Sequence, residues 1–234
     1  MESNDTLRYS RQIAIENIGK DGQDKLRTSR VTIVGCGALG SMAAMQIAGA
    51  GIGKIRIADF DTIDISNLQR QFFFKSEEAG KNKAEILKER IISLNENVQV
   101  DIFPRMVTKN NIKDIFTDTD FVIDATDNPS SKYLIESICE VMSIPCCIGG
   151  VSEFHAQVTT ILPGGIKFKD LFPDTESGGF TPCSVGGVIG PVAVICASLQ
   201  AAEAMKYILN VGELLDGKLL RFDLLTNQYQ LFAF

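Results

Sequence analysis

Several common signals of function are missing from this sequence of 234 residues. None of its six cysteines forms a C-x-x-C pair, so we expect neither a zinc site nor a disulfide framework. The first residues are polar and charged, which argues against a signal peptide. The longest apolar run, residues 188–199, contains a Gly-Pro step and is shorter than the roughly 18 residues of a membrane span. We therefore expect a cytoplasmic protein with no membrane partner.

An excess of positive charge is also missing. The chain carries 23 Lys and Arg against 29 Asp and Glu, a formal net charge of −6. Such a chain has no broad electrostatic footprint for nucleic acid, so any phosphate must be held by a few local cations and backbone N–H groups. The length and the ordinary hydrophobic fraction, 45%, predict one α/β domain over residues 1–234.

The order of the apolar runs predicts a Rossmann-like doubly wound sheet, parallel in its first half, with antiparallel strands added in the C-terminal half. Strands are expected at residues 30–34, 55–58, 98–103, 121–125, 145–149, 157–161, 219–223 and 228–232. Helices are expected at residues 41–50, 80–95, 110–116, 130–142 and 188–209. We expect Gly19 and Gly22 to divide residues 7–26 into two short helices. Residues 163–187, rich in Gly and Pro, predict a mobile loop, which is more often functional than accidental.

A glycine-rich turn follows the first predicted strand. The run Gly35-Cys36-Gly37-Ala38-Leu39-Gly40 fits G-x-G-x-x-G, in which Gly35 allows a tight turn and Gly37 lets the backbone approach a phosphate. The following helix would offer free N–H groups to that anion. Asp59, at the end of the second strand, is placed to accept from ribose hydroxyls, although a strand-end Asp in a turn is the alternative. Alone, the turn predicts a nucleotide, by default NAD.

A polar run in the next loop points away from NAD. Within Ser66–Gln71, Arg70 is a permanent planar cation suited to phosphate oxygens, and Asn67 can donate from its amide. Lys83 could reach the same place from the start of the next helix, although a solvated helix residue is the simpler interpretation. Several such donors suit phosphate-transfer chemistry, because charge on the phosphates must be offset in the transition state.

The third apolar strand ends in Asp124-Ala125-Thr126-Asp127-Asn128. The ligand crevice of an open α/β sheet lies at the carboxyl ends of its strands, so an Asp there could hold a Mg²⁺ ion that bridges phosphates. The alternative is a helix N-cap, provided by Asp127 or Asn128 ahead of Pro129. By itself Arg11, in the N-terminal segment, would be interpreted as part of a solvated face.

These runs together resemble the ThiF/MoeB/HesA family, bacterial relatives of the ubiquitin-activating enzymes, with ThiF as the nearest match. The resemblance covers nearly the whole chain. It is carried by RYSRQI at 8–13, SRVTIVGCGALGS at 29–41, DFDTIDISNLQRQ at 59–71, GKNKAE at 80–85, DATDN at 124–128 and SLQAAEAMK at 198–206.

The resemblance implies a homodimer that uses ATP and Mg²⁺ to adenylate the C-terminal Gly carboxylate of a ubiquitin-like sulfur-carrier protein ending in Gly-Gly. Residues 29–150 would form the nucleotide-binding half and residues 151–234 the carrier-binding half. Arg11 would reach across the dimer, and Asp127 would organise the Mg²⁺. The implied nucleotide contacts are Gly35, Gly37, Ala38, Asp59, Asp61, Ser66, Asn67, Arg70, Lys83, Asp127 and Asn128. Thiamine biosynthesis is the favoured pathway and molybdopterin synthesis the alternative, with a sulfurtransferase or cysteine desulfurase as sulfur donor.

Three positions depart from the family pattern. Ala38 stands where Gly is common, so its methyl must fit close to the nucleotide. Residues 167–170 occupy the place of a C-x-x-C pair that binds zinc in many members, and no second pair follows, so we expect no zinc. Cys183 matches a cysteine that can bond covalently to the carrier, although an inert loop cysteine is the alternative.

Two other classes of function remain open. An NAD-dependent oxidoreductase would use the same turn but would leave Asn67, Arg70, Lys83 and Asp127 without a shared role. A non-catalytic module that only binds a ubiquitin-like protein would not need the cations Arg70 and Lys83.

Overall fold

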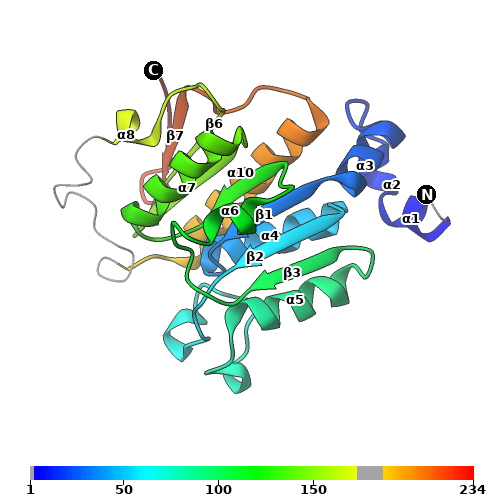
Figure 1. The fold of residues 1–234 in the computed structure, drawn as a ribbon, viewed down its shortest axis with the longest axis horizontal. Helices are drawn as coiled ribbons and strands as arrows, with labels where there is room; N and C mark the ends of the chain where they lie inside the picture. The colour runs from blue at the N-terminus through cyan, green and yellow to red at the C-terminus, as the bar shows by residue number, and fades with distance from the viewer. Residues whose placement is uncertain (1–2, 173–186) are drawn as a thin grey trace.

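The computed structural model describes residues 3–172 and 187–234, and these residues include one eight-stranded sheet of order β3-β2-β1-β4-β5-β6-β7-β8. The neighbours from β3 to β5 pair in parallel, and those from β5 to β8 pair antiparallel (Figure 1). This confirms the predicted mixed α/β sheet. The strands are β1 (Arg30–Val34), β2 (Lys54–Ala58), β3 (Gln99–Phe103), β4 (Phe121–Asp124), β5 (Cys146–Ser152), β6 (His155–Ile161), β7 (Lys218–Asp223) and β8 (Gln228–Ala233).

Helices cover both faces of the sheet. One face packs against α4 (Ala38–Ala50), α5 (Lys83–Leu94) and α10 (Gly190–Leu209), and the other against α6 (Ile112–Phe116) and α7 (Pro129–Met142). The central strands are buried on both sides because successive side chains alternate between the faces. In β4, Phe121 and Ile123 join the first core, whereas Val122 joins the second. The other α-helices of the described residues are α1 (Ser3–Arg8), α2 (Ser10–Ile13), α3 (Gly19–Thr28) and α8 (Phe168–Leu171).

Three expectations from the sequence were wrong in detail. Gly22 does not break a helix: it lies buried inside α3, where a Cβ atom would come within 3.0 Å of Leu209 Cδ2. β5 continues through Gly149 and Gly150 to Ser152, because β6 pairs with it along its whole length. The predicted loop 163–187 contains the short helix α8, and its residues 173–186 lie outside the described part of the chain.

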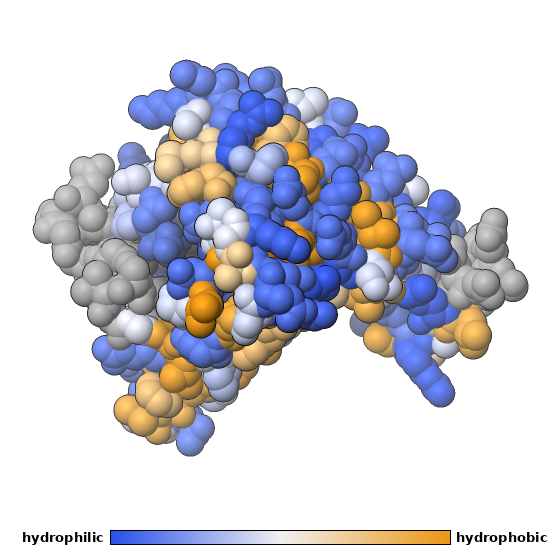
Figure 2. Space-filling model, turned by 90° about the horizontal axis from the view of Figure 1, so that it is seen from below, coloured by the Kyte–Doolittle hydropathy of each residue, from blue (hydrophilic) through white to orange (hydrophobic). Residues whose placement is uncertain are grey.

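By length and composition alone, helix α10 is long and apolar enough to cross a membrane. Half of its most apolar 18-residue window is nevertheless buried inside the fold, against α4 and strands β4–β6. It also carries Glu203, which is 2% exposed and ion-paired with Lys206. We interpret α10 as the central core helix. Near α5 the molecular surface is mostly hydrophilic, with hydrophobic residues in several smaller groups (Figure 2).

Candidate active site

A pocket of about 570 Å³ lies at the carboxyl ends of β1, β2 and β4, where an open α/β sheet binds its ligands. Its size suits a nucleotide. Its walls come from the Gly-rich turn, the loop after β2, the loop after β3, the first turn of α7 and the end of β5. The Gly-rich turn (35–40), the polar loop (66–71) and the end of β4 (Asp124) are far apart in sequence, and the parallel sheet brings them together.

The Gly-rich turn is fixed by close backbone contacts. Gly35 has φ +94°, and a Cβ there would lie 2.8 Å from the Ala125 carbonyl oxygen. A Cβ on Gly40 would lie 1.8 Å from the Gly35 carbonyl oxygen, so α4 could not pack this closely with any other residue. Gly37 precedes α4 and Ala38 begins it, and both line the pocket. The first N–H groups of α4 therefore open toward the ligand position.

Asp59 ties the end of β2 to this turn. Its carboxylate accepts from the backbone N–H of Cys36 and, at 2.7 Å, from that of Asp61. Burial raises the pKa of Asp59, and these two backbone hydrogen bonds and Lys83 oppose the rise. Asp59 thus stabilises the turn, as in the alternative interpretation given above, and it also lines the pocket.

Lys83 lies in the pocket wall rather than on a solvated helix face. It begins α5, is 5% exposed, and its Nζ is 3.2 Å from Asp61 Oδ2. Asn82 caps the helix by accepting from the N–H groups of Ala84 and Glu85, which fixes the position of the lysine. The alternative interpretation of Lys83 was therefore wrong.

The loop after β2 contributes only part of its predicted set. Asn67 and Arg70 line the pocket, and Arg70 Nη1 donates to the Ser66 carbonyl oxygen at 3.1 Å. Ser66 is not among the residues that line the pocket. Its exposed hydroxyl donates to Asp64, because the two residues form the first turn of a short 3₁₀ helix.

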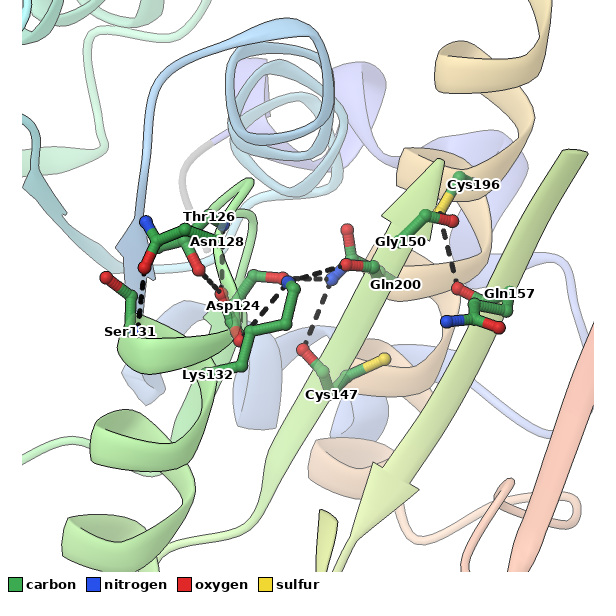
Figure 3. A network of polar contacts seen from close by, with 11 residues as sticks. Asp124, Thr126, Asn128, Ser131, Lys132, Cys147, Gly150, Gln157, Cys196 and Gln200 are labelled. Carbon is green, nitrogen blue, oxygen red and sulfur yellow. Dashed lines mark hydrogen bonds and ion pairs between the residues drawn. The ribbon is translucent and has the colours of Figure 1, made fainter. Parts of the chain in front are cut away.

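Asp124, the last residue of β4, and Asp127, three residues later, have different surroundings. Asp124 is fully buried, 3.4 Å from Lys132 Nζ, and accepts from the N–H and hydroxyl of Thr126 (Figure 3). Lys132 also donates to the Gly149 carbonyl oxygen at 2.8 Å. Asp127 is exposed at the pocket, and we find no ion pair or hydrogen bond to its carboxylate from the described residues. It is the carboxylate that remains available to a ligand.

Asn128 has the capping role given above as an alternative. Asn128 precedes Pro129, the first residue of α7, and its Oδ1 accepts from the N–H of Ser131 at 2.9 Å (Figure 3). It also lines the pocket, so capping and a place at the site coexist.

Besides Ser66, one predicted residue of the described part of the chain, Arg11, is not brought to the pocket. Arg11 is exposed on α2, and the neighbouring Arg8 donates to the carbonyl oxygen of Leu94, at the end of α5. The N-terminal helices therefore lie by the amino ends of the strands, opposite the pocket (Figure 1). Cys183 lies outside the described residues, and the structure says nothing of its role.

Several residues that line the pocket were not predicted as site residues. Arg105, Met106 and Val107 follow β3, and Gln71 ends the polar run already singled out. The rule that ligands bind at the carboxyl ends of strands would have found the loop after β3. No comparable signal distinguishes Gln71 from the exposed Gln69.

Comparison with known proteins gives the family. The profile of the ThiF family matches residues 9–234. The "SAMP-activating enzyme E1" of Haloferax volcanii is 37% identical over 224 residues, which is 95% of this chain and 83% of that protein. The "Sulfur carrier protein ThiS adenylyltransferase" of Escherichia coli is 34% identical over 235 residues, 100% of this chain and 93% of that protein.

Two further comparisons cover less of the other protein. A "Probable molybdopterin-synthase adenylyltransferase" of Porphyra purpurea is 37% identical over 96% of this chain, which spans 60% of that protein. A crystal structure of E. coli MccB with ATP superposes with TM-score 0.83 over 97% of this chain and 71% of that one, at 24% identity, a likeness of fold alone. The relatives confirm the adenylyltransferase expected from the sequence, and the chain belongs to the ThiF family.

Proposed function

We propose that this chain uses ATP and Mg²⁺ to adenylate the C-terminal carboxylate of a ubiquitin-like sulfur-carrier protein. The observation that carries the proposal is the gathering of Asn67, Arg70 and Lys83 around the Gly-rich turn, in a chain whose relatives are named adenylyltransferases. A nicotinamide cofactor would give these three donors no shared role.

The chemistry needs positioning and charge rather than a protein nucleophile. A carboxylate oxygen of the carrier forms a bond to the α-phosphorus, and the bond from that phosphorus to pyrophosphate breaks with its electron pair. The N–H groups at the start of α4 would hold the phosphates, and Arg70 and Lys83 would offset the charge on the departing pyrophosphate. Holding both reactants in line supplies the remainder of the acceleration.

The free carboxylate of Asp127 fits a Mg²⁺ ion, which is usually held by one or two carboxylates together with substrate phosphates and water. Asp124 does not fit that role, because Lys132 and Thr126 already occupy its oxygens. No cluster of three His, Cys, Asp or Glu side chains that could hold a metal occurs within residues 3–172 and 187–234. We expect calorimetry to show ATP affinity that depends on Mg²⁺ in the wild type and much less in Asp127→Asn. Equal dependence in both would contradict this assignment.

A homodimer would explain the position of Arg11. The residue is exposed at the end of the fold opposite its own pocket, from where it would reach the pocket of a second copy. Sedimentation of the purified protein at micromolar concentration tests this arrangement, and a monomer under turnover conditions would contradict it.

The carrier would bind the half from residue 151 to 234. Its last strand, β8, exposes apolar side chains that have no role in the core of the subunit, including Leu231, which is 58% exposed, and Phe232, which is 42% exposed. Exposed apolar groups of this kind often mark protein-binding surfaces. Cys183 would then act on the activated carboxylate, or a sulfurtransferase or cysteine desulfurase would deliver the sulfur directly.

We favour thiamine biosynthesis as the pathway. Molybdopterin synthesis stays the second candidate, because a ThiS adenylyltransferase and a probable molybdopterin-synthase adenylyltransferase match this chain at similar identity. ATP–pyrophosphate exchange with purified ThiS and with the molybdopterin-synthase carrier tests function and pathway together. We expect exchange that requires a carrier. Nicotinamide protection against thermal unfolding, with none from ATP, would contradict the proposal.

A further inference from the structure

Gln71 is a buried polar residue in the pocket wall to which the proposed function has given no role. Its side chain is 4% exposed. Its backbone is fixed at both ends, because its N–H donates to the Asn67 carbonyl oxygen at 3.0 Å and its own carbonyl accepts from Phe74 at 3.2 Å. The backbone that carries the side chain is therefore held in place before any ligand arrives.

The carboxamide of Gln71 has two unlike ends. Its Oε1 is buried and has no hydrogen-bond partner. Its Nε2 lies beside the Gly-rich turn, 3.6 Å from where a Cβ on Gly37 would be. The side chain thus turns its donor toward the turn and leaves its acceptor unpaired. An unpaired buried acceptor destabilises the fold, and such features persist mainly where function requires them.

The donor end of Gln71 faces the place of an anion. Gly37 precedes α4, whose first N–H groups and positive dipole end open onto the same pocket. Asp59, the expected ribose contact, accepts from Cys36, the residue just before Gly37. The phosphate next to the ribose is the α-phosphate, so this is the phosphate nearest Gly37 and Gln71.

We propose that Gln71 is a further catalytic residue, whose Nε2 donates a hydrogen bond to a non-bridging oxygen of the α-phosphate as the carboxylate attacks. The inference rests on the proposed function. The carboxylate oxygen bonds to phosphorus, pyrophosphate leaves with the electron pair of the broken bond, and Gln71 neither gains nor loses a proton. A fixed neutral donor is most effective where charge increases in the transition state.

The variant Gln71→Met tests this role, because it keeps the length of the side chain and removes both polar atoms. We expect kcat in carrier-dependent ATP–pyrophosphate exchange to fall about 100-fold. The Kd for ATP should stay within about threefold of wild type, a change under one kcal/mol. Because the unpaired Oε1 is also removed, Tm should be unchanged or higher by roughly 2–4 °C.

The matched control is Gln69→Met, the same change two residues away at an exposed position outside the pocket wall. It should leave kcat unchanged. Three results would overturn the role of Gln71: an unchanged kcat, a loss confined to ATP affinity, or a lower Tm that accounts for the lost activity. Failure of the proposed function looks different, because the wild type itself would then show no exchange with either carrier.

Discussion

In the parallel half of the sheet the polar side chains at the strand ends are buried and paired, whereas in the antiparallel half the apolar side chains of the last strand are exposed. Asp124 and Lys132 are 0% and 2% exposed and face each other at the pocket wall, which Lys132 lines. Every residue of β8 is exposed. The first arrangement fixes donors and acceptors for a small charged ligand. The second leaves apolar surface for a macromolecule.

Breaking the buried ion pair of Asp124 and Lys132 should give the largest change in stability. Lys132→Met would leave the Asp124 carboxylate buried without its cation, and we expect the free energy of unfolding to fall by about 3–5 kcal/mol. Urea unfolding measures the change. The double variant Asp124→Asn/Lys132→Met removes both charges and should recover most of the loss. A single variant as stable as the wild type would contradict our view that the parallel half depends on this pairing.

Two glycines of α4, Gly40 and Gly49, test how closely the turn must pack. Gly40→Ala would place a Cβ 1.8 Å from a backbone oxygen that cannot move away, so we expect a loss of about 3 kcal/mol and a distorted nucleotide turn. Gly49→Ala is the matched control, because its Cβ would meet Leu94 at an ordinary 3.7 Å. That variant should be more stable than the wild type by about 0.5–1 kcal/mol. Equal effects at both positions would show that close packing at the turn does not matter.

The exposed half should give the smallest effect on stability. Leu231→Ser is expected to change the free energy of unfolding by less than about 0.5 kcal/mol, because the side chain lies largely in solvent. The KM for the carrier should nevertheless rise about tenfold if this surface binds it. Val141→Ser, at an exposed apolar position on α7, is the control and should change neither quantity. An unchanged KM in Leu231→Ser would remove β8 from the carrier surface.

The sequence predicted the parts of the fold and site that depend on local patterns. The β-branched run from Arg30 to Val34 predicted β1, and the turn after it predicted a ligand site at this edge of the sheet, although α4 begins at Ala38 and not at the expected residue 41. Local patterns did not distinguish neighbours within one loop. Ser66 faces Asp64 within a local turn, whereas Phe72, the neighbour of Gln71, packs against Gly190, where a Cβ would lie 2.7 Å from the Phe72 ring. That packing joins segments more than 100 residues apart, and no short motif records it.

The measurement that most directly tests the central claim is carrier-dependent ATP–pyrophosphate exchange in the wild type and in Arg70→Ala. Arg70 lines the pocket and makes a hydrogen bond to Ser66, so its loss should spare the fold while exchange falls about 100-fold or more. Arg27→Ala, which removes an exposed arginine from α3, is the control. Wild-type exchange that disappears in Arg70→Ala and persists in Arg27→Ala is the predicted result. Exchange that Arg70→Ala leaves unchanged would contradict the account.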